Sequence, residues 1–430
     1  LGQAWAGTET VRIEYSSDGG SSWTVLTDTA PASDELYGWN VDGLPGSPLY
    51  RVRITCVEDT PASDMSGNFR VGATLDYYVN DLFTTNDVYC TVVGNDDNDG
   101  LTPGSPKATV QAVLAAYDLE PGDVVYVDTG TYVLSSNIAV GSLDGGSSGN
   151  PVTLLGSTHP DGTVVNRNST ASGAYGFYIA TSYVRIRGFR VKGGQYGIYV
   201  NGTGAEIVRC ELFENTTGLY VASGVSGGQV VNNLIRANTT GLYSDSYNAY
   251  SVVNNTVVGN TTYGIYVDSS FYGRFSNNVV SAEGSGRYCA FYSSSISAGA
   301  TWDYNDLYAS GGAVLGYYGA VARQTFGEWR AATGKDTNSI SENPLFVNTG
   351  GGDYHLSSTG GSWHGGAFTA DAVSSPCIDG GDPTSSYSNE SLPNGGRVNM
   401  GAYGNTEEAS RTPVEQVLAL LAPVGGELWK

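Results

Sequence analysis

Two carboxylates could form a small acidic site. Asp245 and Asp268 each lie two positions after a tyrosine, in the repeated segments "TGLYSD" and "YGIYVD". If these segments are adjacent parallel strands in register, the two carboxylates lie about 5 Å apart. That separation suits a calcium pair or the two acids of a retaining glycosidase. The alternative is an exposed turn, because the equivalent positions of other repeats hold Asn201, Ala222 and Ser294.

The segment "NDDNDG" (95–100) has the spacing of a calcium loop. Asn95, Asp97 and Asp99 occupy alternate positions before a glycine. The last ligand position of an EF-hand would fall on Pro106 instead of glutamate, so the segment is not an EF-hand. We expect either a structural calcium here or side chains that cap backbone turns. No other cofactor is expected.

Tyrosine recurs at nearly constant spacing through the middle of the chain. The repeated residues are Tyr178, Tyr199, Tyr220, Tyr243, Tyr266 and Tyr292. The differences between successive positions are 21, 21, 23, 23 and 26 residues. A period of roughly 20–25 residues with short strands is typical of a solenoid, in which each coil buries its apolar edge on the next.

Side-chain alternation along a strand assigns the two faces of each repeat. The residue before each tyrosine points inward, and the expected core residues are Phe177, Ile198, Leu219, Leu242, Ile265 and Phe291. The outward tyrosines would form an aromatic stripe that stacks on sugar rings or packs against a neighbouring filament. The plainer alternative is that tyrosine is a favoured residue of half-exposed strands.

Asparagines also recur in register with the repeats. They are Asn233, Asn255, Asn278 and Asn305. Because they fall at a turn, their amides can hydrogen-bond from coil to coil, and we expect them to be structural.

The chain resembles right-handed parallel β-helix proteins of the pectate-lyase-like superfamily. The stretch "VVGNDDNDGLTPGSPKATVQAVLAAYDLEPGDVVYVDTGTY" is similar to their first segment, with a capping helix near Thr109–Tyr117. The stretches "TFGEWRAATGKDTNSISENPLF" and "SSPCIDGGDP" are similar to the late coils of large extracellular members. The resemblance covers residues 87–410 and implies an all-β parallel β-helix. It says little about activity, because this fold carries lyases, hydrolases, epimerases and noncatalytic adhesins.

The resemblance also implies where a lyase or epimerase would place its catalytic groups. Such an enzyme needs a basic side chain opposite a calcium-bound uronate, and "VRIRGFRVKGG" supplies several basic residues on its outward phase. The candidate set is Lys192, Arg190, Arg209, Asp245 and Asp268. The hydrolase branch uses a GHG motif that this chain lacks, and His159, His355 and His364 lie outside the central coils. A pectin hydrolase is therefore disfavoured.

Residues 1–72 are predicted to form an immunoglobulin-like β-sandwich that lacks its first strands. "TVRIEYSSDGGSSWTVL" (Thr10–Leu26) indicates a hairpin, and "LYRVRITCV" and "GNFRV" indicate later strands. The stretch resembles immunoglobulin-like or fibronectin-like modules of bacterial and archaeal surface proteins. A sandwich without its first strands would expose a sheet edge and part of its core. We expect residues 73–86 to link this module to the β-helix.

The tail, residues 411–430, resembles the first strand of a further module through "PVGGELW". The expected linking strand contains Leu418, Leu420, Leu421, Pro423, Leu428 and Trp429. Three explanations stay open. The sequence is one period of a covalent tandem array, or the tail of one subunit completes the sandwich of the next by strand addition, or it is a fragment with ragged boundaries.

Composition limits the partners. Lys and Arg number 20 against 42 Asp and Glu, a net charge of −22. Nucleic acid and anionic membrane surfaces are therefore disfavoured, because the long-range interaction would be repulsive. The five cysteines are scattered, without the spacing of a metal site or redox motif. Sequons that a glycosylating host could modify occur at Asn168, Asn201, Asn215, Asn238, Asn254, Asn260 and Asn389.

These observations favour a noncatalytic extracellular structural protein. It would be one unit of a cell-surface filament or long adhesin, with copies of itself as the partners, linked head to tail. The alternatives are a lyase or epimerase acting on acidic polysaccharide, and a glycan-binding β-helix without turnover.

Overall fold

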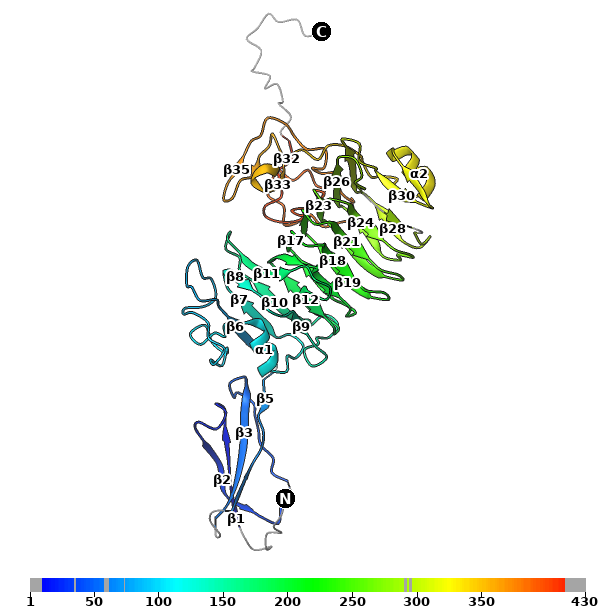
Figure 1. Ribbon diagram of the computed structural model, residues 1–430. Helices are drawn as coiled ribbons and strands as arrows, with labels where there is room; N and C mark the ends of the chain where they lie inside the picture. The colour runs from blue at the N-terminus through cyan, green and yellow to red at the C-terminus, as the bar shows by residue number, and fades with distance from the viewer. Residues whose placement is uncertain are drawn as a thin grey trace, which may run out of the picture.

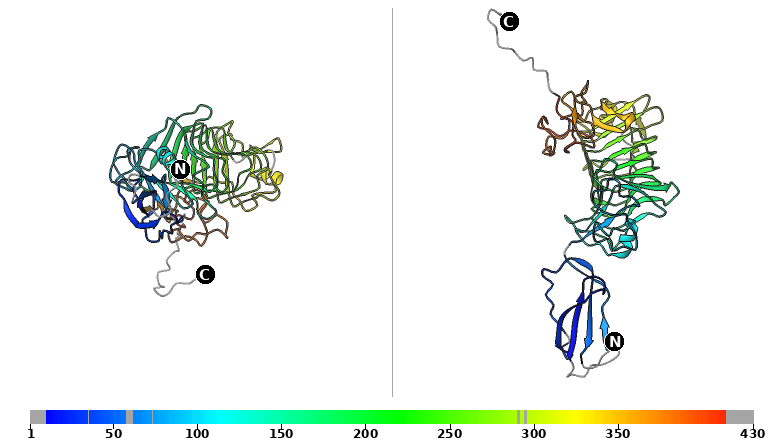
Figure 2. Two further views of the ribbon diagram at one scale, coloured as in Figure 1. Left: turned by 90° about the horizontal axis from the view of Figure 1, so that it is seen from below. Right: turned by 90° about the vertical axis from the view of Figure 1, so that its left-hand side faces the viewer.

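The computed structural model describes residues 10–34, 36–57, 62–72, 74–289, 292–293 and 296–413, with only the backbone of 292–293. An N-terminal antiparallel sheet is followed by a long β-helix and then a loop-rich C-terminal segment (Figure 1). Figure 2 shows the same order along one axis, with the N-terminal sheet beyond one end of the coils. The chain is therefore all-β, as the sequence predicts.

The N-terminal sheet has the strand order β2-β1-β3-β4, with β5 also paired to β3. Its strands are β1 (Thr10–Ser16), β2 (Thr24–Pro31), β3 (Ser47–Cys56), β4 (Ser63–Met65) and β5 (Phe69–Val71). The antiparallel arrangement is compatible with an immunoglobulin-like module.

One face of this sheet is apolar. Ile13 pairs with Ile54, and Tyr15 pairs with Val52, so these side chains share a face. Among the described residues, no second sheet covers this face. The segment 36–46 covers part of it instead, through Trp39, whose ring lies 4.9 Å from that of Tyr15. Apolar side chains that stay exposed on this face or on the covering segment are Leu36, Tyr37, Val41, Ile54 and Phe69.

The β-helix consists of three parallel sheets that each coil visits in turn. The first sheet contains β6 (Asp76–Val79), β7 (Val124–Val127), β10 (Val152–Gly156), β13 (Val184–Arg187), β16 (Glu206–Val208), β19 (Ser226–Val231), β22 (Ala249–Val253), β25 (Arg274–Ser276) and β28 (Thr301–Asp303). The second sheet contains β8 (Gly130–Val133), β11 (Thr163–Ser169), β14 (Phe189–Gly194), β17 (Glu211–Phe213), β20 (Leu234–Arg236), β23 (Thr256–Val258), β26 (Val279–Glu283) and β29 (Asp306–Ser310).

The third sheet carries the repeated tyrosines. Its strands are β9 (Ile138–Val140), β12 (Tyr175–Ile179), β15 (Tyr196–Val200), β18 (Thr217–Val221), β21 (Thr240–Ser244), β24 (Tyr263–Val267), β27 (Tyr292–Ser293), β30 (Gly316–Tyr318) and the antiparallel β31 (Val321–Arg323). Phe177, Ile198, Leu219, Leu242 and Ile265 are buried in the core, as predicted. Phe291 lies outside the described residues.

The predicted asparagine ladder is confirmed at the turn between the first and second sheets. Asn233 donates from its backbone and its side chain to Oδ1 of Asn255, at 3.0 and 2.9 Å. Asn255 donates in the same way to Asn278, and Asn278 to Asn305. All four side chains are fully buried, so each coil satisfies the polar groups of the next.

A second ladder, not predicted, lies at the turn between the second and third sheets. The backbone of Asn215 donates to Oδ1 of Asn238, and that of Asn238 to Oδ1 of Asn260, both at 3.0 Å. Each of these asparagines is followed by two threonines, so each also begins one of the predicted sequons. The structure shows that the same asparagines face the core.

Both ends of the β-helix are covered. Helix α1 (Val110–Ala116), capped at Thr109, packs on the N-terminal end as predicted. The interval 73–86, predicted to be a linker, instead contributes β6, because Tyr77 and Val79 bury their side chains in the core. Late elements are α2 (Phe326–Thr333), β32 (Phe346–Asn348), η1 (Thr349–Gly351), β33 (Asp353–Leu356), β34 (Ser362–Trp363) and β35 (Phe368–Thr369).

The segment 377–412, here called the C-terminal cap, has no strand or helix among its residues. It lies along the turn between the first and second sheets. Nδ2 of Asn232 donates to the carbonyls of Ala402 and Gly404, at 2.9 and 2.8 Å, and Nδ2 of Asn254 donates to the carbonyl of Asn399 at 2.8 Å. These turn side chains therefore hold the cap on the coils.

Candidate functional site

The structure does not bring the predicted lyase residues together. Gly188 forms the turn between β13 and β14, so the basic stretch divides between the first and second sheets. Arg190 and Lys192 lie on β14 of the second sheet, where they form ion pairs with Glu211 and Glu214 of the next coil at 2.6 and 2.9 Å. A catalytic role for Lys192, Arg190 and the acidic pair stays a prediction.

Asp245 and Asp268 lie at equivalent positions, directly after the carboxyl ends of β21 and β24 in the third sheet. Their backbone amides donate to the carbonyls of Val221 and Ser244, so the two residues are in register as predicted. The hydroxyl of Tyr220 donates to Oδ2 of Asp245 at 3.2 Å. The acidic pair therefore belongs to the tyrosine surface, on a different sheet from Lys192.

The repeated tyrosines form a stack along the third sheet. Parallel pairing places them in register from Tyr178 through Tyr292. The ring of Tyr243 lies 4.8 Å from that of Tyr220 and 4.7 Å from that of Tyr266, with an interplanar angle of 7° in both pairs. We call Tyr178, Tyr199, Tyr220, Tyr243 and Tyr266 the tyrosine stack.

The stacking geometry decides what this surface can offer a ligand. The pairs Tyr178–Tyr199, Tyr220–Tyr243 and Tyr243–Tyr266 are nearly parallel, so these rings cover one another's faces. The rings of Tyr199 and Tyr220 are instead tilted by 39°. A sugar stacks on a free aromatic face, whereas the stack presents ring edges and hydroxyls. The proposed binding role of these residues stays a prediction, and contact through edges and hydroxyls is the form that the geometry favours.

The predicted calcium loop already holds an internal cation. Nζ of Lys107, which is buried, donates to the backbone carbonyls of Asp96 and Asn98 at 2.9 and 2.7 Å. Side chains of Asn95 and Asp99 accept hydrogen bonds from backbone amides two residues later. The loop is therefore organised by turn capping and an ammonium group, which is the alternative that the sequence left open.

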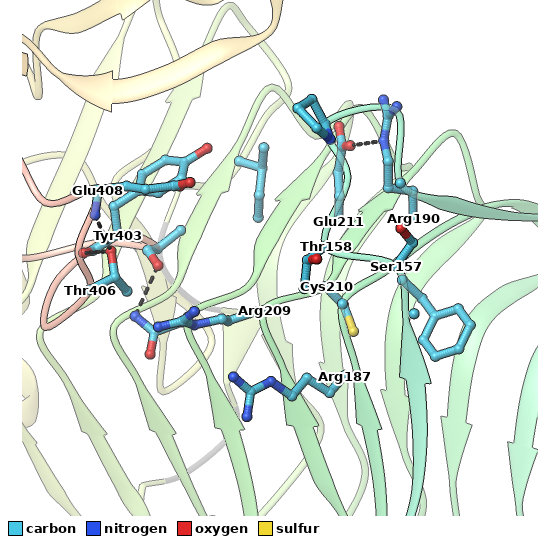
Figure 3. Close-up of a pocket in the computed structure, with 18 of the residues that line it drawn as sticks. Ser157, Thr158, Arg187, Arg190, Arg209, Cys210, Glu211, Tyr403, Thr406 and Glu408 are labelled. Carbon is cyan, nitrogen blue, oxygen red and sulfur yellow. Dashed lines mark hydrogen bonds and ion pairs between the residues drawn. The ribbon is translucent and has the colours of Figure 1, made fainter. Parts of the chain in front are cut away.

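The sequence did not predict a cleft between the coils and the C-terminal cap (Figure 3). Its volume is about 580 Å³, and it is bounded by residues 157–162 on one side and residues 402–408 on the other. Arg187 at the end of β13 and Arg209 in the turn after β16 lie on its floor, one coil apart. Figure 3 shows both side chains extending toward the side on which the cap lies.

Arg187 and Arg209 differ from the other cations of these coils. Arg185 and Arg190 form ion pairs with Glu206 and Glu211 at 2.7 and 2.6 Å. Within the part of the chain that the structure describes, neither Arg187 nor Arg209 forms an ion pair or a side-chain hydrogen bond. Partial burial, and then the positive charges of Arg209 and Arg185, lower the pKa of Arg187 from its ordinary value.

The three parallel sheets, the continuous core and the turn ladders define a right-handed parallel β-helix protein. Residues 126–308 match the model of the family described as periplasmic copper-binding protein NosD. Residues 294–381 match the model of a family described as disaggregatase related. No curated protein matches this chain.

Solved structures similar to this chain include enzymes that act on carbohydrates. Pectate lyase Pel9A is 15% identical and aligns with a TM-score of 0.44, covering 76% of this chain and 96% of its own. The alginate lyase from Paenibacillus sp. str. FPU-7 is 17% identical with a TM-score of 0.29, covering 50% and 95%. The GH136 lacto-N-biosidase from Eubacterium ramulus is 12% identical with a TM-score of 0.35, covering 56% of each chain.

The family description raises the question of copper. Among the described residues, no three His, Cys, Asp or Glu side chains are grouped so that they could hold a metal ion. All five cysteines are buried, and the thiols of Cys90, Cys210 and Cys289 donate to backbone carbonyls. This donor set does not fit a copper site, and we derive no chemistry through copper. In the described part of the chain, no helix is long and apolar enough to span a membrane.

Proposed function

We propose that this chain is a noncatalytic extracellular surface protein, a unit of a filament or long adhesin linked head to tail through its N-terminal module. The observation that carries the proposal is the apolar face of the N-terminal sheet. Among the described residues, a loop covers this face instead of a second sheet, and Ile54 and Phe69 stay 39% and 36% exposed. Contiguous exposed apolar surface is typical of interaction sites, and this face is where we place the contact.

The proposed occupant is the strand 418–429 of the next unit, in the same or another polypeptide. Its residues lie outside the described part of the chain, so the linking role rests on the sequence pattern "LLAPVGGELW". An extended, apolar segment of this kind can bind by adding main-chain hydrogen bonds at a sheet edge and side chains to an apolar face. Repetition of this contact without closure generates a line of units.

The body supports a structural role because each coil is joined to the next along its length. Two asparagine ladders, the tyrosine stack and a continuous core join each coil to the next. The candidate catalytic residues are dispersed: Arg190 and Lys192 lie on the second sheet and are engaged in ion pairs, and Arg209 lies in a turn. Asp245 and Asp268 follow strands of the third sheet. Such a body suits a spacer, and placement at the cell surface is part of the proposal.

A synthetic peptide of residues 414–430 tests the linkage. Labelled peptide is titrated with the full chain by fluorescence anisotropy, and the chain alone is examined by electron microscopy. We expect binding that Ile54→Asp removes and that Val25→Asp leaves intact, because Val25 is 45% exposed on the opposite face of the same sheet. Absence of peptide binding, or equal effects of the two variants, would overturn the proposal.

A further inference from the structure

We propose that the cleft between the coils and the C-terminal cap binds the carboxylate or sulfate group of an acidic glycan between Arg187 and Arg209. This site is separate from the head-to-tail linkage, and each proposal can fail without the other. The argument starts from the turn that the cap follows.

The turn between the first and second sheets carries one outward residue per coil, in left-handed backbone conformation. In three successive coils this residue is Asn232, Asn254 or Asn277. The first two donate to backbone carbonyls of the cap, and Oδ1 of Asn277 accepts from the amide of Asp382 at 2.7 Å. The cap therefore lies along this column of asparagines and is held by their side chains.

Arg209 occupies the next position of the same column, and the cap does not cover it. Its φ of 51° matches the 57° of Asn232, so the backbone of the turn is unchanged. In the preceding coil the equivalent residue is Gly188, which has no side chain to fill the space. At these two coils the column of turn residues is therefore not covered by the cap, and it forms the floor of the cleft. This floor is about 10 Å wide, which corresponds to two strand spacings.

Among the described residues, neither arginine on this floor forms an ion pair, although Glu407 and Glu408 lie on the cap wall of the same cleft. Arg185, Arg190 and Arg236 neighbour the cleft and are neutralised by Glu206 and Glu211. Arg187 and Arg209 lie on adjacent coils and extend toward the cap, in a chain whose net charge is −22. Two uncompensated guanidinium groups one coil apart repel each other unless an anion lies between them.

The geometry suits an oxyanion carried by a larger molecule. A guanidinium binds carboxylate or sulfate through paired N–H donors, and two of them from adjacent coils can hold opposite sides of one group. The cleft is larger than an ion, at about 580 Å³, and Thr158 and Tyr403 line its two walls. These walls offer hydroxyl groups and an aromatic ring beside the charged floor, which are the contacts that a sugar residue uses.

Binding is measured by isothermal titration calorimetry on the full chain. The probes are an oligogalacturonide, which carries carboxylates, a chondroitin sulfate oligosaccharide, which carries both groups, and neutral maltohexaose. The variants are Arg187→Gln and Arg209→Asn, alone and combined. Asparagine is the residue that other coils place at the position of Arg209, so this variant keeps the turn. Arg12→Gln removes a distant exposed arginine and is the charge-matched control.

We expect wild-type protein to bind at least one anionic probe and not maltohexaose, with affinity that falls as salt rises. Each single variant should weaken binding about tenfold to a hundredfold, and Arg12→Gln should not. Binding of the oligogalacturonide identifies a carboxylate ligand, and binding of the sulfated probe alone identifies a sulfate. The inference is overturned if neither anionic probe binds, or if binding survives the double variant.

Discussion

The guanidinium of Arg70 and the carboxylate of Asp123 join the N-terminal sheet to the β-helix through two parallel contacts of 2.6 Å. Arg70 lies on β5, and Asp123 precedes β7. The carboxylate is fully buried and also accepts hydrogen bonds from the amides of Leu75 and Glu120. The junction between the two units is therefore fixed by a desolvated, bidentate ion pair.

Asp123→Asn tests this junction. The substitution leaves Arg70 without its counter-charge at a partly buried position, and breaking such a pair costs about 3–5 kcal/mol. We expect a loss of this size in the free energy of unfolding, measured by urea denaturation. Asp28→Asn removes the partner of Arg12 in an exposed pair and should cost less than about 1 kcal/mol. Equal losses in the two variants would show that the Arg70–Asp123 pair stabilises the chain no more than an exposed ion pair does.

Asn255→Ala tests the asparagine ladder. The side chain accepts two hydrogen bonds from Asn233 and donates to Asn278 and to the carbonyls of Val230 and Val253. Its removal leaves several buried groups unsatisfied, so we expect the free energy of unfolding to fall by about 3 kcal/mol or more. Asn201→Ala, at an exposed turn, should change it by less than about 0.5 kcal/mol. A small loss for Asn255→Ala would show that the buried hydrogen bonds of the ladder contribute little to the free energy of unfolding.

Expression in a glycosylating host tests the sequons. Asn215, Asn238 and Asn260 are only 4%, 1% and 2% exposed, and their amides are engaged in the second ladder. We expect peptide mass spectrometry to find these three unmodified, and Asn254 as well, because it holds the cap.

The exposed sequons are Asn168, Asn201 and Asn389, and these are the positions where modification is expected. Glycan found at Asn238 in folded protein would contradict the ladder.

Glu390 makes the stability of the C-terminal cap depend on pH. Burial, which outweighs hydrogen bonds from the amides of Asn405 and Asn399, raises the pKa of Glu390 from 4.5 to about 7. Between these two pKa values the folded chain keeps a proton that the unfolded chain releases. The free energy of unfolding should therefore fall as pH rises from about 4.5 to about 7.

Urea denaturation at pH 5, 6, 7 and 8 measures this effect. Glu390→Gln removes the titrating group and keeps the oxygen that accepts both amides, so its stability should depend less on pH across this interval. Some dependence will persist, because burial also raises the pKa of Asp306 to about 7. An unchanged pH profile in the variant would show that Glu390 is already ionised in the folded chain.

Much of the β-helix follows from the sequence because its signals are periodic. The inward residues beside the tyrosines, the asparagine ladder and helix α1 all depend on a repeat that can be read directly. The ion pairs between neighbouring coils could also have been predicted from this repeat. Glu206 and Glu211 lie 21 residues after Arg185 and Arg190, one period later, whereas the same step from Arg187 falls on Val208.

The cleft was beyond sequence reasoning for a physical reason. Its second wall comes from the C-terminal cap, which contacts Asn232 and Asn254 across 145–172 residues of chain. The cap has no strand or helix, so no periodic pattern reveals where it lies. The second ladder was missed because asparagine followed by threonine is typical of both exposed sequons and buried turn residues, and only burial distinguishes them.

The turn ladders also bear on how such a molecule can change in evolution. Each rung presents to its neighbour the same amide pattern that it receives, so a duplicated stretch of one period would find its polar groups already matched on both sides. The number of coils can therefore change while both ends of the β-helix stay the same. Related proteins with different numbers of coils can then keep the same N-terminal junction and the same C-terminal cap.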